Sequence, residues 1–461
     1  MATLYLAAAL LVTVLPAWLW LERLVPKGIT ARTCLIAGYS GLLGMLATTL
    51  IMQTVSALGI LISLQSVGGA ALLLAVAAKA VPQTWRTTSV TAPARDQQTL
   101  SRLQQCLILI CLALLASRLL VLGMEVGTRP VWSWDAKQHW TKQAKVFFEL
   151  RSIAPYVPLQ EWLQLGGKGV YTNMHPDYPI ATPLLQAWIS IAIGQWHDSL
   201  VNAPWVLMWL SLGLVFYGQA RVAGASPTVA IAATYMILSL PYLNIHVALA
   251  GYADLLMAAC YLGAVAALYN WSQSRERWQL ILALLCGVCC LLIKNEGFYW
   301  FLTLFPGILL VIAGTRKGIM CAAALAVALL ALMWIMPADF AVAGHSLEDL
   351  NLKYRPDSWR PLYLSALVHD NWHMLGYLFL AAILIIPFSG HRQIPLAAVT
   401  LSAVLLYMAL YLLTDNAAGA VRFTSLNRVF LQLAPAIAFF TLTVYLTLSG
   451  APPKDPQVIA R

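Results

Sequence analysis

Long apolar runs dominate the pattern of the chain. They are about 17–22 residues long and are separated by short polar or basic turns. A run of this length crosses the bilayer core, about 30 Å thick, as an α-helix. The runs are continuous rather than alternating, which disfavours a β-barrel. The pattern predicts an all-α polytopic membrane protein with about 13 transmembrane helices, at about 3–21, 33–53, 57–78, 105–125, 203–220, 226–247, 255–271, 279–293, 298–314, 319–337, 373–389, 393–413 and 429–448.

Basic residues in the short turns predict the orientation of these spans. Arg275, Arg316 and Arg392 each follow an apolar run, and such turns face the cytoplasm under the positive-inside rule. An outer N-terminus and an inner C-terminus satisfy every short basic loop. The predicted organisation is a group of extra N-terminal helices (1–78), a cytoplasmic linker (79–104), a membrane module (105–448) and a cytoplasmic tail (449–461).

One long polar segment, residues 126–202, is predicted to form an outer loop. Within it, 136–150 has apolar and basic residues on largely opposite faces, which is typical of a helix lying in the membrane interface. The segment 180–195 is apolar but short. Because the span at 203–220 must end inside, the count of crossings leaves none for 180–195, and we expect a second surface helix there. The first helix presents Trp140, Ala144, Phe147 and Phe148 on one face and Lys137, Lys142 and Lys145 opposite.

Composition narrows the class of protein. The chain is 61% hydrophobic and 10% charged, whereas soluble domains are about 25% charged. The formal net charge of +10 is spread over the turns, so we expect no nucleic-acid partner. All eight cysteines fall in apolar runs and are interpreted as packing residues, and the adjacent Cys289 and Cys290 lack the spacing of a metal site.

Ionisable residues gather on the predicted outer side. Such groups are expensive at membrane depth and are therefore functional candidates. Their shared side favours one site at the outer face over a translocation path, which needs polar groups at mid-depth. We expect Asp135, His175, Asp254 and Glu296 to surround one cavity, with Lys294 or Arg428 on its membrane side.

Five ordered segments carry a family resemblance. They are WSWD (132–135), HPDYPIATPLLQAW (175–188), GYADLLMA (251–258), LLIKNEGFYW (291–300) and RVFLQLAPA (428–436). Together they resemble the GT-C integral membrane glycosyltransferases, especially the bacterial branch akin to protein mannosyltransferases and the aminoarabinose transferase of lipid A. The resemblance covers roughly 105–448.

The resemblance implies a GT-C-like helical bundle in the bacterial inner membrane. It also implies inverting transfer of a sugar, on the outer (periplasmic) face, from a polyprenyl-phosphate donor to a lipid, glycan or protein acceptor. A carboxylate would take the acceptor proton, and cations would stabilise the departing phosphate. No cofactor is certain, and a divalent cation, Mg²⁺ or Mn²⁺, stays open.

The resemblance assigns catalysis to Asp135 and Asp254, and each has a structural alternative. Asp135 with Gln138 matches a helix capping box, and Asp254 stands where it would cap the next span. Lys294 and Glu296 are assigned to substrate binding but would equally pair with each other. The other assigned substrate-binding residues are His175, which would equally bridge loop carbonyls, Arg422 and Arg428.

Two other functions compete with sugar transfer. A transporter or flippase of a lipid-linked saccharide would need interrupted helices and polar groups at mid-membrane. An O-antigen-type polymerase or ligase would share the lipid-linked donor chemistry and would suit Arg422 and Arg428. The chain shows no clear internal repeat and few mid-span polar residues, which disfavours the transporter, and the early Asp135 loop favours the glycosyltransferase over the polymerase or ligase.

Overall fold

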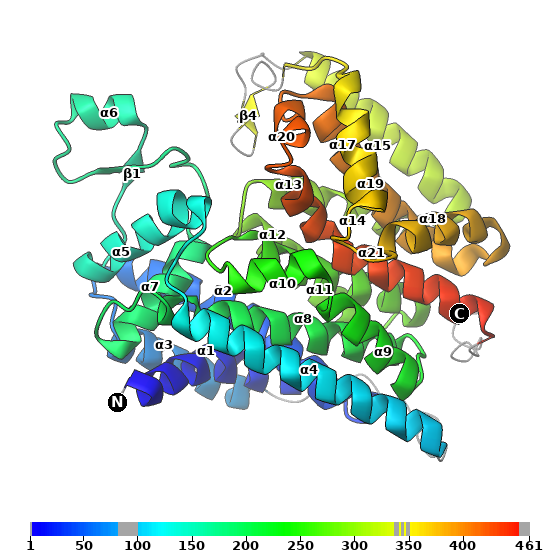
Figure 1. Cartoon of the computed structure of the whole chain (residues 1–461), viewed down its shortest axis with the longest axis horizontal. Helices are drawn as coiled ribbons and strands as arrows, with labels where there is room; N and C mark the ends of the chain where they lie inside the picture. The colour runs from blue at the N-terminus through cyan, green and yellow to red at the C-terminus, as the bar shows by residue number, and fades with distance from the viewer. Residues whose placement is uncertain (1, 82–99, 336–340, 343–344, 347–350, 451–461) are drawn as a thin grey trace. The chain divides into compact units, whose positions relative to one another are not determined.

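The computed structural model describes residues 2–81, 100–335, 341–342, 345–346 and 351–450 (Figure 1). Regular structure among these residues is almost entirely helical, which confirms the predicted all-α class. Two-residue strands are the exceptions. β1 (Tyr156–Val157) pairs in parallel with β2 (Tyr171–Thr172), and β3 (Ala341–Val342) pairs antiparallel with β4 (His345–Ser346).

Eight helical stretches in the described part of the chain are long and apolar enough to cross a membrane. A ninth exists if α9 (Pro227–Leu238) and α10 (Pro241–Ala248), which are bent by 61°, form one broken span. These helices indicate a multi-pass integral membrane protein, as predicted. The eight are α1 (Ala2–Leu24), α2 (Arg32–Ala57), α4 (Arg102–Thr128), α8 (Ala203–Val222), α11 (Asp254–Ser274), α13 with α14 (Glu296–Leu302 and Leu304–Ala313), α19 (Ile394–Leu413) and α21 (Leu426–Leu448).

The prediction of about 13 spans is wrong, because turns shorten several apolar runs. The α3 helix (Leu64–Ala80) starts only after Ser63, whose side chain and that of Ser66 form a capping box. The α12 helix (Arg277–Leu291) and the Leu375–Phe388 segment are shorter still than α3. All three fall below the roughly 20 residues that a perpendicular crossing needs. The run predicted at 319–337 lies mostly on α15 (Thr315–Ile335) and ends outside the described residues.

The first compact unit comprises residues 1–218 and 244–256. Its N-terminal helices α1, α2 and α3 pack together, and α7 (Ala181–Ile193) packs against α1, α2 and α5 (Thr141–Leu150) (Figure 1). The Trp188 indole N–H of α7 donates to Thr13 Oγ1 of α1 at 3.1 Å. The predicted extra N-terminal helices therefore share a core with the predicted outer loop. The predicted linker lies mostly outside the described residues, as does the tail.

The two helices predicted for the 126–202 loop have different outcomes. The first is observed as a π-helical turn, η2 (Ala136–Trp140), followed by α5, and it buries Trp140 and Phe147 while exposing its lysines. Its amphipathic pattern is confirmed. The second, α7, is buried from Ala181 to Ala192 rather than lying on a surface. Most of its positions are apolar, and its polar side chains Thr182, Gln186 and Ser190 are buried with them.

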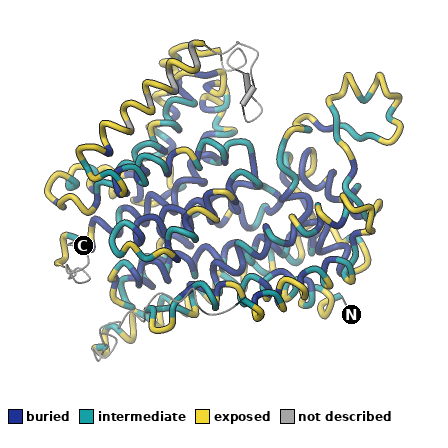
Figure 2. Tube along the Cα trace, turned by 180° about the vertical axis from the view of Figure 1, so that it is seen from behind, coloured by how far each residue is buried: buried dark blue, intermediate teal, exposed yellow. Residues whose placement is uncertain are grey.

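The second compact unit comprises residues 219–243 and 257–461. Within it α14 packs against α15 and α19, and α21 packs against α18 (Leu375–Ile385) and α19. Buried amides join the ends of its helices: Asn270 Nδ2 donates to Gln219 Oε1 at 2.7 Å, and Gln279 Nε2 donates to the same oxygen at 3.2 Å. Figure 2 shows the buried and exposed sides of the helices along the trace.

Candidate functional site

Asp135 lies in the first helical turn before η2. The Lys137 backbone N–H donates to the Ser133 carbonyl at 3.0 Å, so the turn already includes Asp135, which has helical dihedral angles. Its side chain makes no capping hydrogen bond to the helix. The capping-box explanation is therefore not realised. The carboxylate instead occupies a first turn, where the helix dipole stabilises negative charge.

The segment that carries Asp254 lies directly against the Asp135 turn. The Ser133 hydroxyl donates to the carbonyls of Leu249 and Ala250, each at 3.4 Å. Gly251 has φ +108° and packs on Ala136, so a side chain at this position would collide with Ala136 Cβ. Glycine alone adopts a positive φ without strain and has no Cβ to collide with Ala136. Two segments more than 100 residues apart in sequence thus bring their aspartates into one neighbourhood.

Asp254 is fully buried and opens α11. Tyr252, two residues before Asp254, is held in place by two side chains of the same unit. The Trp205 Nε1–H donates to the Tyr252 carbonyl at 3.0 Å, and the His246 ring centroid lies 5.0 Å from that of Tyr252. A carboxyl group in such an interior must be stabilised by its surroundings or be neutral. Trp205 and His246 hold the backbone that leads into Asp254.

A buried amide network supports the Asp135 helix. Gln186 of α7 accepts a hydrogen bond from Thr141 Oγ1 at 3.0 Å and donates from Nε2 to Asn202 Oδ1 at 2.9 Å. All three side chains are buried. Polar groups in an apolar interior are costly unless satisfied, and a satisfied network rigidifies its surroundings. The network ties the start of α5 to α7 and to the turn before α8.

His175 belongs to an aromatic cluster beside the same helix. Its ring centroid lies 5.1 Å from that of His139 and 4.8 Å from that of Tyr178. His139 is buried, and its Nδ1 lies 2.8 Å from Asn173 Oδ1. Sequence reasoning missed His139, although its position four residues after Asp135 places it on the same helical face. The first unit therefore gathers the segments of Asp135, His175 and Asp254.

Lys294 and Glu296 form an ion pair in the second unit. Lys294 Nζ lies 2.8 Å from Glu296 Oε1, and the two side chains are 7% and 21% exposed. This confirms the alternative in which they pair with each other. They occupy the turn between α12 and α13, where Gly297 packs on the Cys290 carbonyl with no room for a side chain.

Arg428 lies in the first turn of α21, in the same unit as this ion pair. Three residues before it, Ser425 accepts a hydrogen bond at Oγ from the Tyr411 hydroxyl at 3.1 Å. Tyr411 was not predicted, because a tyrosine within an apolar run gives no sequence signal. Arg422 is exposed and directly follows α20 (Ala417–Val421).

A buried hydrogen bond aligns the two helices that carry these charges. Trp300 Nε1–H donates to Gln432 Oε1 at 2.6 Å. Trp300 follows Glu296 by one helical turn, and Gln432 follows Arg428 by the same interval, so both charged residues lie one turn before the bond.

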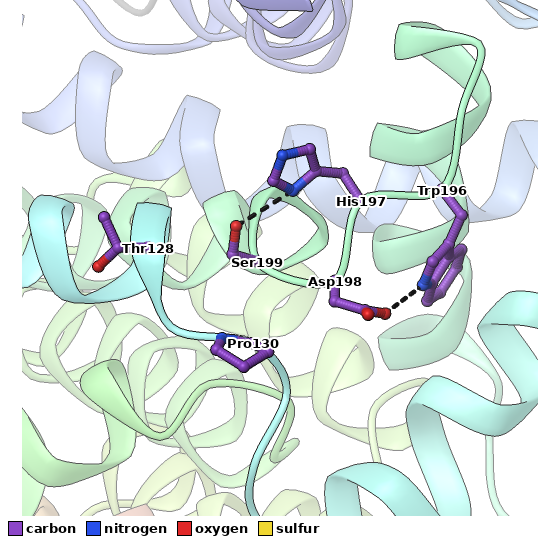
Figure 3. Close-up of a pocket in the computed structure, with 6 residues that line it drawn as sticks. All are labelled: Thr128, Pro130, Trp196, His197, Asp198 and Ser199. Atoms are coloured by element: carbon purple, nitrogen blue, oxygen red, sulfur yellow. Dashed lines mark hydrogen bonds between the residues drawn. The ribbon is translucent and has the colours of Figure 1, made fainter.

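Two pockets open beside the Asp135 helix rather than at Asp135. The first, about 360 Å³, is lined by Thr128, Pro130 and the segment 196–199 (Figure 3). In it Asp198 accepts a 2.6 Å hydrogen bond from the Trp196 indole. Neither pocket is lined by Asp135, His175 or Asp254. The expectation of one cavity shared by all the candidates stays a prediction.

No metal site is evident in the described ranges. Within them no three His, Cys, Asp or Glu side chains are grouped to hold an ion. All eight cysteines are free thiols, and Cys260, Cys286, Cys289 and Cys290 are buried. Their burial agrees with a packing role.

Comparison with known proteins adds no assignment. No protein-family model, no curated protein and no solved structure matches this chain.

Proposed function

We propose that this chain is a membrane glycosyltransferase with a GT-C-like bundle. It would move a sugar from a polyprenyl-phosphate donor to a lipid, glycan or protein acceptor on the outer face of the bacterial inner membrane. The observation that carries this proposal is the contact between the Asp135 turn and the Gly251 turn before Asp254. It supplies two carboxylates on adjoining, well-supported segments.

The first unit carries groups suited to activating an acceptor. A general base must reach the proton that it removes and must keep its orientation during the reaction. Asp135 is placed by a short helix that the Gln186 network supports, and it is partly accessible. Buried Asp254 suits a second role, orienting the acceptor or the base. His175 and His139 would add hydrogen-bonding groups to the same neighbourhood.

Considered by itself, the second unit carries cations suited to binding a phosphate group. Cations that are fixed before reaction stabilise charge as it develops. Lys294 is held by Glu296, and Arg428 provides a guanidinium able to bind phosphate through two hydrogen bonds.

The proposed step is a single displacement. The acceptor hydroxyl oxygen attacks the anomeric carbon on the face opposite the phosphate, and its proton passes to Asp135. The bond from the anomeric carbon to the phosphate oxygen breaks as the new glycosidic bond forms. The bonding electron pair leaves with the polyprenyl phosphate, and the configuration inverts.

One observation favours the transporter alternative. The α9–α10 pair is bent by 61° at a short break, and interrupted helices are typical of transporters. Sugar transfer explains the paired aspartate segments, which transport does not require. A polymerase or ligase would use the same displacement with a different acceptor.

The proposal is tested with the full chain reconstituted in vesicles. A panel of polyprenyl-phosphate sugars is offered with an outer-face membrane extract as acceptor. We expect free polyprenyl phosphate and a glycosylated product to appear together for one donor. Movement of the intact donor across the bilayer with no such release would instead establish a flippase, and a product of increasing repeat length would establish a polymerase.

A further inference from the structure

A second pocket in the first unit combines lysines with tryptophans. It has a volume of about 440 Å³ and lies on the outward face of the helix that follows Asp135. Three lysines and one aspartate line it, so its lining has a net charge of +2. The charged and aromatic lining residues are Lys137, Lys142, Lys145, Asp198, Trp132 and Trp196.

Two of the three exposed lysines lie over tryptophan rings that line the pocket. Lys137 Nζ lies 4.7 Å from the Trp132 ring centroid, and Lys145 Nζ lies 5.9 Å from that of Trp196. Cations within about 6 Å of such a ring face are attracted to it. The one carboxylate, Asp198, accepts a hydrogen bond from the Trp196 indole (Figure 3). The ammonium groups of Lys137 and Lys145 therefore lie beside the two tryptophan rings of the pocket.

The position of the pocket identifies its ligand class. The α4 helix ends at Thr128, and the pocket begins at Pro130. Since α4 is long and apolar and exposes nearly all of its surface, its end marks the boundary between lipid and water. Tryptophans favour that boundary, and lysine clusters there attract anionic headgroups.

We infer that this pocket binds the phosphate headgroup of an anionic membrane phospholipid. The lysine ammonium groups take the phosphate oxygens as point charges, and the tryptophans contact the glycerol and upper acyl carbons. A volume of about 440 Å³ suits a headgroup rather than a whole lipid. The inference is independent of sugar transfer, because Asp135 does not line the pocket.

The test measures lipid binding by the full chain. Detergent-purified protein is titrated with phosphatidylglycerol and with phosphatidylcholine, and bound lipids are counted by native mass spectrometry. We expect tighter binding of phosphatidylglycerol, reduced at least about tenfold in Lys137→Gln/Lys142→Gln/Lys145→Gln. Lys142→Gln alone, whose ammonium is over neither ring, should cost about fivefold and guards against misfolding of the triple variant.

A matched control removes three exposed lysines of the same unit from outside the pocket. Lys27→Gln/Lys79→Gln/Lys168→Gln changes the net charge equally and should bind phosphatidylglycerol like the parent. Equal affinity of the parent for the two lipids would overturn the inference. So would unchanged phosphatidylglycerol binding by the pocket variants, or inorganic phosphate alone binding as tightly as the lipid.

Discussion

The two compact units hold their charged candidates by different means. In the first unit Asp135 and Asp254 begin helices, and neutral hydrogen bonds through Ser133 and Gln186 place the surrounding backbone. In the second, Lys294 is fixed by direct ion pairing with Glu296 in a largely apolar setting. Neutral networks tolerate loss of a nearby charge, whereas a buried ion pair does not tolerate loss of one partner. Activity and stability should therefore separate in the first unit and change together in the second.

The largest stability effect should come from the ion pair. Lys294→Met leaves the Glu296 carboxylate without its partner in a mostly buried position, and breaking such a pair costs about 3–5 kcal/mol. Thermal unfolding of the purified variant should show a clearly lower midpoint. The double variant Lys294→Met/Glu296→Met should recover most of the loss, because no unpaired charge remains. An unchanged midpoint in the single variant would remove the contrast between the units.

A smaller effect should follow from filling the contact between the two aspartate segments. Gly251→Ala adds a methyl group that meets Ala136 and requires φ near +108°, so we expect a cost of about 2–4 kcal/mol together with loss of sugar transfer. Thermal unfolding and donor turnover would be measured together. Gly123→Ala is the matched control, because Gly123 lies in α4 with open space around it and no positive φ. Equal behaviour of the two variants would show that the close approach of Gly251 and Ala136 is unimportant.

The periodicity of apolar and polar residues predicted the elements that depend on the local sequence pattern. The spacing of Trp140, Phe147 and the lysines is sufficient to specify an amphipathic helix, and that helix is present. The same approach failed for α7, because its polar residues Thr182, Gln186 and Ser190 share a face that proves to be buried with the apolar residues. Counting apolar runs also overestimated the number of spans, because turns such as 58–63 and the end of α12 at Leu291 shorten the helices.

The candidate site was predictable only in part. Sequence order and expected membrane side grouped Asp135 with Asp254, but the contact depends on Gly251 meeting Ala136, which is a tertiary fact. The pairing of Lys294 with Glu296 was a stated alternative because the two lie in one short turn. Tyr411 and Asn173 could not be found, since a polar side chain within or beside an apolar run becomes informative only when its partners are known.

The central claim is that the Asp135 carboxylate accepts a proton during sugar transfer. Asp135→Asn removes the base while keeping nearly the same shape, and asparagine suits a helix N-terminus about as well as aspartate, so the protein should stay folded with a thermal midpoint close to that of the parent. Turnover of the polyprenyl-phosphate sugar donor by purified protein should fall about 10²–10⁴-fold. A stable Asp135→Asn protein with near-normal turnover would contradict the account and would move the proton acceptor to Asp254 or Glu296.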